Sequence, residues 1–311
     1  SVRAHLDGRT LVRYVVASSE VGAVVANETG ARLVGLGPLA PITDALGFLR
    51  LSAERIARPS TSAASRDAAL ASAQDASATL AAALVDPLRP LTDRMVVVPS
   101  GPLHGIPWTL VTGRAATVVP SAAAWLAAQQ TPVRNGRAVV VQGPELEFAE
   151  LESKLVAAAT KATTTREVGP TIDSLEHAAH AHFACHARPR VDRPMFSSLI
   201  LDDGELTLHD IEGLDQAPGT VVLASCSSGT NVLASGDEVM GLANAFLAIG
   251  ARTVVAPLFT VSDAATAQVM VSVGKAVERG GNLLGALLAG SQDPDPVVAF
   301  TAASFNCFGA D

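Results

Sequence analysis

From about residue 138 onward, short apolar runs alternate with helical segments, and this alternation restricts the fold more than any other feature of the chain. Apolar runs of four to eight residues bounded by turn residues are typical of buried strands. Strands that alternate with helices predict an α/β fold, a mostly parallel sheet with helices on both faces. The expected strands are 138–141, 162–168, 178–187, 220–226 and 253–258, and the expected helices are 147–160, 171–177, 209–214, 238–249, 263–277 and 283–289.

Two local patterns in this region are more specific. The helix expected at 147–160 is amphipathic, with Leu151, Leu155 and Ala158 predicted to face the sheet. The runs 199–201 and 205–208 flank Asp202-Asp203-Gly204, which is a turn sequence, so we expect a β-hairpin there.

The residues before 131 follow a different pattern. Three Val-rich runs predict a β-meander, and a long helical stretch follows before two further short strands. The strands are expected at 11–17, 21–26, 31–36, 95–99 and 116–119, and two helices between 41 and 90. Because 131–137 is polar and rich in turn residues, we expect an N-terminal α/β accessory subdomain over 1–130 and a second subdomain over 131–311, with its sheet starting near residue 137.

The composition argues against several classes of function. A formal net charge of -8 with 17% charged residues disfavours a nucleic-acid partner, which would require a basic surface. No apolar run reaches the length of a membrane span, and the first ten residues lack the apolar segment of a signal peptide. Three cysteines without a framework spacing favour a reducing compartment, so we expect a cytoplasmic protein. The chain does not begin with Met, and we expect further domains upstream.

His186 and Cys226 each lie at the downstream end of an apolar run. Ligands and chemistry gather at the carboxyl ends of the strands in such a sheet. Neighbouring strands lie about 4.8 Å apart, so the two side chains can meet if their strands are adjacent. A thiol beside an imidazole is the minimal apparatus of a cysteine hydrolase, with Cys226 as nucleophile and His186 as general base. The alternative is that Cys226 is a small buried residue, as free cysteines often are.

An oxyanion hole needs backbone N–H groups beside the nucleophile. The amides of Ala187 and Cys226 are the candidates, because both follow strand ends. The other two cysteines, Cys185 and Cys307, are expected in the core, since strand alternation directs Cys185 away from the face that His186 occupies.

Three carboxylates are candidates for binding the substrate. Asp237 and Glu238 open a helix directly after the Cys226 loop, and Asp263 opens the next helix along the chain. Carboxylates at these positions favour the helix dipole and cap backbone amides, which accounts for them without any function. The functional alternative is that they select a basic side chain in a substrate.

We expect no metal and no cofactor. His180 and His182 share a strand face with His186, but three ligands on one extended strand would be too far apart to enclose one ion. His182 is expected either to orient another group or to be a core histidine with its hydrogen bonds satisfied, and His104 to be a packing or turn residue. The chain has no phosphate-binding glycine motif after a strand and no Gly-x-Ser-x-Gly elbow.

The ordered set of these motifs resembles the CHAT domain, a caspase-like module. The histidine and cysteine segments, the helix and strand that follow them, and an upstream Pro-rich stretch carry the resemblance. These are His-Phe-Ala-Cys-His-Ala (182–187), Leu-Ala-Ser-Cys-Ser-Ser-Gly (223–229), Gly-Asp-Glu-Val-Met-Gly-Leu-Ala-Asn-Ala-Phe-Leu (236–247), Gly-Ala-Arg-Thr-Val-Val-Ala-Pro-Leu (250–258) and Val-Val-Val-Pro-Ser-Gly-Pro-Leu-His-Gly-Ile-Pro-Trp (96–108).

The resemblance implies a caspase-like fold, with 131–311 as the catalytic subdomain, and membership of the clan of caspases, separases and gingipains. It also implies a His186–Cys226 dyad that cleaves peptide bonds of a protein substrate, controlled by upstream sensor or partner domains such as TPR arrays. The clan often has His-Gly where this chain has His186-Ala187, and Ala still offers its backbone N–H.

The leading hypothesis from the sequence is therefore a cysteine endopeptidase. Two alternatives remain open. The chain could be a regulatory or protein-binding module that keeps the fold without cleaving, or a thiol hydrolase or acyltransferase that uses the same dyad on another substrate.

Overall fold

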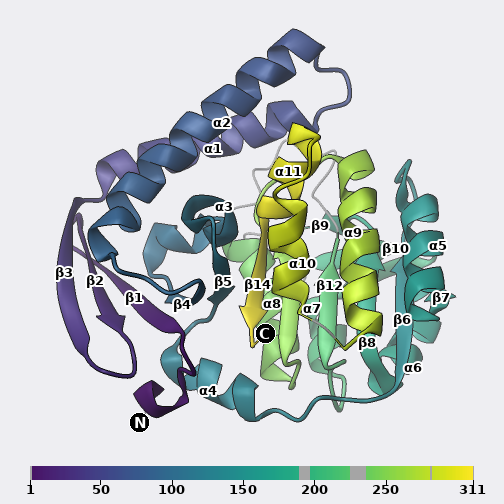
Figure 1. Cartoon of the computed structure of the whole chain (residues 1–311). Coiled ribbons are helices and arrows are strands. Elements are labelled where there is room, and N and C mark those ends of the chain that lie inside the picture. The colour runs from purple at the N-terminus through teal and green to yellow at the C-terminus, as the bar shows by residue number, and fades with distance from the viewer. Residues whose placement is uncertain (1, 189–196, 225–235, 281, 311) are drawn as a thin grey trace.

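The computed structural model describes residues 2–188, 197–224, 236–280 and 282–310. These residues form an 11-stranded sheet flanked by helices, with strand order β3-β2-β1-β4-β5-β14-β13-β12-β8-β6-β7 (Figure 1). The strands are β1 (Thr10–Ala17), β2 (Glu20–Ala26), β3 (Ala31–Pro38), β4 (Arg94–Val98), β5 (Ala115–Val118), β6 (Arg137–Gln142), β7 (Thr163–Thr165), β8 (Ala178–Ala184), β12 (Thr220–Leu223), β13 (Thr253–Pro257) and β14 (Phe305–Gly309). A smaller sheet contains β9 (Ala187–Arg188), β10 (Ser198–Leu201) and β11 (Gly204–Thr207).

The large sheet consists of two halves that run in opposite directions. Strands β7, β6, β8, β12 and β13 are parallel to one another. Strand β14 is antiparallel to β13 and parallel to β5, and β5, β4 and β1 continue in that direction. The carboxyl ends of the two halves therefore lie at opposite edges of the sheet. The predicted mostly parallel α/β sheet is confirmed.

The strand that leads to His186 is directly hydrogen-bonded to the strand that leads to Cys226. In the parallel pair of β8 and β12, Thr220 lies opposite His180 and Leu223 opposite Phe183. The two strands are therefore adjacent, which is the condition that the dyad hypothesis requires. Both strands are almost wholly buried, as is typical of strands at the centre of a parallel sheet.

Helices cover both faces of this half. One face packs against α5 (Ala149–Thr160), α9 (Asp263–Glu278), α10 (Leu283–Gly290) and α11 (Pro296–Ala303), and the other against α6 (Val168–His177), α7 (Leu208–Glu212) and α8 (Gly236–Ala248) (Figure 1). The N-terminal half is covered by α1 (Ala40–Ala57), α2 (Ala63–Leu84), α3 (Trp108–Thr112) and α4 (Ala122–Gln130). Short 3₁₀ turns occur at η1 (Val2–His5), η2 (Asp86–Leu88) and η3 (Gly101–Gly105).

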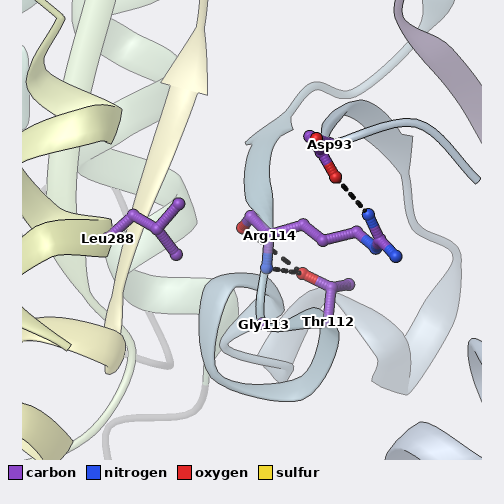
Figure 2. Close-up of a pocket in the computed structure, with 5 residues that line it drawn as sticks. All are labelled: Asp93, Thr112, Gly113, Arg114 and Leu288. Carbon is purple, nitrogen blue, oxygen red and sulfur yellow. Dashed lines mark hydrogen bonds and ion pairs between the residues drawn. The ribbon is translucent and has the colours of Figure 1, made fainter. Parts of the chain in front are cut away.

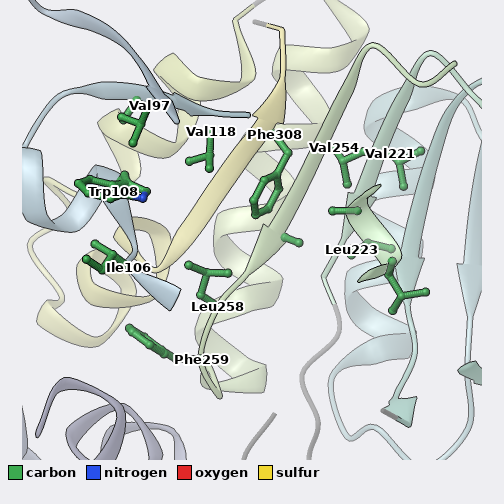
Figure 3. Close-up of a cluster of buried hydrophobic side chains, with 14 of the residues drawn as sticks. Val97, Ile106, Trp108, Val118, Val221, Leu223, Val254, Leu258, Phe259 and Phe308 are labelled. Carbon is green, nitrogen blue, oxygen red and sulfur yellow. The ribbon is translucent and has the colours of Figure 1, made fainter. Parts of the chain in front are cut away.

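One apolar core extends across both halves of the sheet. Val97, Val118, Phe308, Val254 and Val221 come from five consecutive strands of the sheet and belong to one buried cluster (Figure 3). In the N-terminal half, the rings of Tyr14 in β1 and Trp108 in α3 are stacked, with their centroids 4.8 Å apart. Because the core is continuous, the boundary between subdomains 1–130 and 131–311 is not marked by a gap in packing and stays a prediction.

The C-terminal elements α11 and β14 were not predicted from the sequence. Strand β14 inserts between β5 and β13 and is buried along its whole length. Its five residues, Phe-Asn-Cys-Phe-Gly, contain no Val or Ile run, and Gly309 has a positive φ of 94°. A short strand without a β-branched run gives a weak periodic signal.

The inward face of α5 differs from the prediction. Leu151 and Leu155 are 50% and 42% exposed, and Glu152, Ser153 and Val156 are buried instead. The helix is thus rotated relative to the expected orientation, and the reason lies in a buried partner of Glu152 that is described below.

The stretch Ala63–Leu88, which contains α2, is long and apolar enough to cross a membrane by length and composition. A third of its most apolar window, 33%, is buried inside the structure, and its Ala and Leu side chains contribute to the same core cluster as α1. Core helices commonly share this composition, so the property alone is weak support for a membrane location.

Candidate functional site

His186 lies just beyond the carboxyl end of β8, which ends at Ala184. The ladder between the two central strands continues past β12, because the Ala224 N–H donates to the Phe183 carbonyl at 3.0 Å. The segments that lead to His186 and Cys226 therefore run side by side up to Ala224. Cys226 itself belongs to 225–235 and lies outside the residues that the structure describes.

The His186 ring contacts the loop that follows β6. Its Nε2 lies 3.3 Å from the backbone carbonyl oxygen of Glu145. A carbonyl oxygen only accepts, so this contact favours the tautomer with the proton on Nε2. The neutral ring then carries its lone pair on Nδ1. The backbone of Glu145 thus favours one tautomer of the ring.

The loop over 143–148 is itself held against the strand that carries His186. The Gly143 N–H donates to the Ala184 carbonyl at 2.9 Å. A Cβ at Gly143 would lie 2.5 Å from both the Cys185 Cβ and the Ile200 carbonyl oxygen, which leaves no room for a side chain. Glycine at this position therefore lets the loop approach β8 closely enough to reach the imidazole.

The Ala187 amide is oriented away from its neighbouring strand. The Ile200 N–H donates to the His186 carbonyl at 2.8 Å, and Ala187 pairs with Leu199 in the antiparallel register of β9 and β10. Hydrogen-bonded and non-hydrogen-bonded pairs alternate in such a ladder, so the Ala187 N–H points away from β10. This orientation is compatible with the predicted oxyanion role.

Asp263 lies close to His186, although it is not the helix cap that the sequence predicted. Ser262 is the N-cap of α9, with its hydroxyl accepting from the Ala265 N–H at 3.5 Å, and Asp263 is the first helical residue. The Asp263 Oδ2 instead accepts the Phe148 N–H at 3.1 Å. Burial raises the pKa of Asp263, the Phe148 N–H and the charge of His186 oppose that rise, and Glu147 adds to it.

The other two predicted carboxylates, Asp237 and Glu238, fall in the first turn of α8. Their side chains lie outside the described part of the chain. Their predicted role in substrate binding stays a prediction.

A buried acid–base pair lies beneath the site, and sequence reasoning did not find it. The His182 Nε2 and Glu152 Oε1 atoms are 2.6 Å apart, with side chains 1% and 3% exposed. Burial raises the pKa of Glu152, the hydrogen bond to His182 opposes the rise, and the charge of Asp263 adds to it. This pair explains the orientation of α5, because a buried carboxylate needs a partner and His182 supplies it. The one sequence signal was that His182 lies on the same face of its strand as His180 and His186.

A second buried histidine lies one strand repeat away on the same face. His180 is 4% exposed. Burial and, to a smaller extent, the charge of His182 lower its pKa to about 3, against the opposing effect of a hydrogen bond with the Thr220 backbone. His180 is therefore neutral in the folded protein near pH 7.

The remaining candidates have structural positions. Cys185 and Cys307 are buried in separate clusters of the apolar core, as predicted. His104 lies half-buried in η3, in the turn where the sequence placed it. Within the described ranges, no group of three or more His, Cys, Asp or Glu side chains is arranged to hold a metal ion.

A cavity of about 340 Å³ opens elsewhere, between the start of β5 and α10 (Figure 2). Asp93, Thr112, Gly113, Arg114 and Leu288 line it. Its charged side chains already pair with each other, with Arg114 Nη1 2.7 Å from Asp93 Oδ1, and the Thr112 hydroxyl donates to the Trp108 carbonyl at 2.6 Å. The lining contains no nucleophile with an adjacent base, so this cavity is not where we locate the chemistry.

Comparisons with known proteins agree with the motif pattern. The family model of the CHAT domain matches residues 74–292. Among solved structures, the Arg-specific cysteine proteinase gingipain R is similar over 86% of this chain and 74% of that chain, with 9% sequence identity and a TM-score of 0.48. No curated protein matches this chain.

Proposed function

Because the chain belongs to the CHAT domain family, we propose that it is a cysteine endopeptidase in which His186 and Cys226 form the catalytic dyad. The observation that carries the proposal is the direct pairing of β8 with β12, which brings the two chain segments to the same edge of the sheet. The contact between the His186 Nε2 and the Glu145 carbonyl supports it, since it leaves Nδ1 as the basic nitrogen.

The proposed reaction has two stages. The imidazole of His186 takes the proton of the Cys226 thiol, and the thiolate attacks the peptide carbonyl carbon. The backbone amides of Ala187 and Cys226 stabilise the oxyanion, and the protonated His186 gives its proton to the leaving amine. Water then hydrolyses the thioester, which releases the acid product and restores the thiol.

The charges around His186 favour a basic residue in the substrate. Glu145 and Glu147 are exposed on the loop after β6, and the raised pKa of Asp263 includes a contribution from Glu147. Asp237 and Glu238 begin the helix after the Cys226 loop. A carboxylate-rich rim attracts cationic peptides and disfavours acidic ones. We therefore propose that these carboxylates, with Asp263, contribute to substrate selection.

The regulatory part of the proposal concerns segments outside the chain. A peptidase in the cytoplasm must be silent until it is needed, so we propose control by an upstream sensor region or a partner protein. The substrate is a protein or peptide, and the chemistry needs no cofactor.

The experiment is cleavage of a proteome-derived peptide mixture, read by mass spectrometry. Cys226→Ala and His186→Ala are expected to lose activity by roughly 10³-fold or more, because the dyad acts as a unit. Cys307→Ala removes a buried thiol in β14 and is the matched control, with activity retained. Cleavage that persists unchanged in Cys226→Ala would reject the dyad, and an inactive wild-type chain with its regions upstream restored would favour the non-cleaving module.

A further inference from the structure

The Asp263 carboxylate joins the start of α9 to the start of α5. Ser262 already caps α9, so the carboxylate of Asp263 is not needed for that purpose. Its Oδ2 accepts the N–H of Phe148, the N-cap residue of α5, at 3.1 Å. The hydrogen bond connects two segments 115 positions apart in the chain. A carboxylate that accepts an N–H makes a stronger hydrogen bond than a neutral acceptor would.

The segment that Asp263 holds is the same loop that contacts the His186 ring. At its first residue, the loop is fixed by the bond from the Gly143 N–H to the Ala184 carbonyl. At its far end it is fixed by Asp263 through Phe148. Between these anchors lies the Glu145 carbonyl, 3.3 Å from the His186 Nε2. Releasing the Asp263 anchor would free the carbonyl that orients the ring.

Asp263 also interacts with His186 through its charge. Burial raises the pKa of Asp263 and the charge of His186 opposes that rise, so the carboxylate and the ring interact electrostatically. The other described ionisable groups around Asp263 are Glu147 on the loop and Glu152 on α5, and Glu152 is paired with His182 of β8.

We propose that Asp263 is a positioning residue for His186, because it holds the 145–148 loop against the ring. The proposal rests on the proposed function, in which His186 is the general base. The positioning role adds to the substrate selection proposed above, and the two roles predict different results.

The first test does not depend on catalysis. Chains with ¹⁵N-labelled histidine are studied by NMR, and the His186 signals are assigned by their loss in His186→Ala. The ¹⁵N chemical shifts of the ring distinguish the two neutral tautomers, and the Glu145 carbonyl favours the one with its proton on Nε2. In Asp263→Ala the Phe148 N–H loses its acceptor, so the preference for this tautomer is expected to weaken. In Asp263→Asn the amide oxygen can still accept that N–H, so the preference should be kept. Asp295→Ala is the matched control, because Asp295 accepts backbone N–H groups at the start of α11, and it should leave the His186 tautomer unchanged.

The second test uses the rate of peptide cleavage. Asp263→Ala loses the loop anchor and should lower kcat by roughly 10-fold or more, with KM little changed. Asp263→Asn keeps an acceptor for the Phe148 N–H and should retain most of kcat. Circular dichroism checks that each variant folds.

An unchanged His186 tautomer in Asp263→Ala would overturn the proposal. A rise in KM for peptides with a basic residue, with kcat unchanged, would also overturn it and leave Asp263 with substrate selection alone. A wild-type chain without peptidase activity would count against the proposed function, while the NMR comparison would still decide the relation between Asp263 and His186.

Discussion

The two halves of the sheet pair their buried polar side chains in different ways. The half that leads to His186 encloses an acid–base pair, His182 with Glu152, and a second histidine, His180. In the other half, three buried polar side chains bond to the backbone: the Tyr14 hydroxyl donates to the Leu84 carbonyl at 2.9 Å, Arg9 donates to the Leu6 carbonyl at 3.3 Å, and Asn306 bridges two backbone groups. Burying an acid–base pair costs free energy, so its presence beneath one edge indicates that this half is shaped by more than packing.

The direction of the strands separates the halves further. Because β14 runs antiparallel to β13, the carboxyl end of β4 lies at the opposite edge from that of β8. The stretch after β4 then returns over the sheet until the Trp108 N–H reaches the Asn306 side chain. The motif at 96–108 therefore braces the seam between the halves, and the His186 edge carries the chemistry that we propose.

The largest expected effect concerns the buried pair. Glu152→Ala should lower the free energy of unfolding by about 3–5 kcal/mol, because it leaves His182 without its partner in the interior. Glu152→Gln should cost less, since the amide still bonds to the ring. Both are measured by urea denaturation followed by circular dichroism.

Glu150 is the control for this comparison. It lies on the same helix, is exposed, and pairs with Lys154 at 2.6 Å. Surface pairs of this kind contribute little, so Glu150→Ala should hardly change stability. Equal losses of unfolding free energy in Glu150→Ala and Glu152→Ala would mean that the buried pair contributes no more than a surface pair, and the contrast between the halves would then fail.

The next largest effect tests the seam in the other half. The Asn306 side chain accepts the Trp108 N–H at 2.9 Å and donates to the Ile106 carbonyl at 3.0 Å. Asn306→Ala leaves both backbone groups without this partner, and we expect a loss of about 2–4 kcal/mol in urea denaturation. Asn282→Ala removes only the cap of α10 and should cost about 1 kcal/mol. A seam variant no less stable than this cap variant would contradict the bridging role.

The smallest effect is a pH dependence of the ionisable half. The pKa of His180 is lowered from 6.5 to about 3 in the folded state. As the pH falls from 6.5 towards 3, His180 binds a proton in the unfolded chain but stays neutral in the folded chain, so the free energy of unfolding decreases over that range. This group alone should remove about 2 kcal/mol between pH 7 and pH 5.

The measurement compares wild type with His180→Asn. The difference between the unfolding free energies at pH 7 and pH 5 should be smaller in His180→Asn than in wild type, because the variant lacks the acid-sensitive histidine. The raised pKa of Glu152 changes stability with pH in the opposite direction, but it does so in both proteins. Identical pH slopes for the two proteins would mean that His180 does not resist protonation in the fold.

The sequence was sufficient to predict most of the strands. The Val-rich runs that form β4, β6, β12 and β13 are apolar and have turn residues at their ends, so their existence and chain order could be predicted. The neighbouring positions of β8 and β12 could only be stated as a condition, because strand order in a sheet is set by tertiary packing.

The rest depended on contacts that no local pattern encodes. The predicted orientation of α5 is wrong because the apolar pattern of Leu151 and Leu155 does not determine which face is buried. The buried Glu152 instead pairs with His182, 30 positions away in the chain. Asp263 was predicted as a helix cap, yet its carboxylate bonds to Phe148, 115 positions away. Long-range polar pairs of this kind are fixed by tertiary packing rather than by propensity.

The most direct test of the central claim is the reactivity of Cys226 towards iodoacetamide as a function of pH, in wild type and in His186→Ala. Mass spectrometry separates Cys226 from the buried Cys185 and Cys307. A thiol activated by the imidazole should alkylate with an apparent pKa well below the usual value of about 8.5, and return towards that value in His186→Ala. The same apparent pKa in both proteins would contradict the dyad.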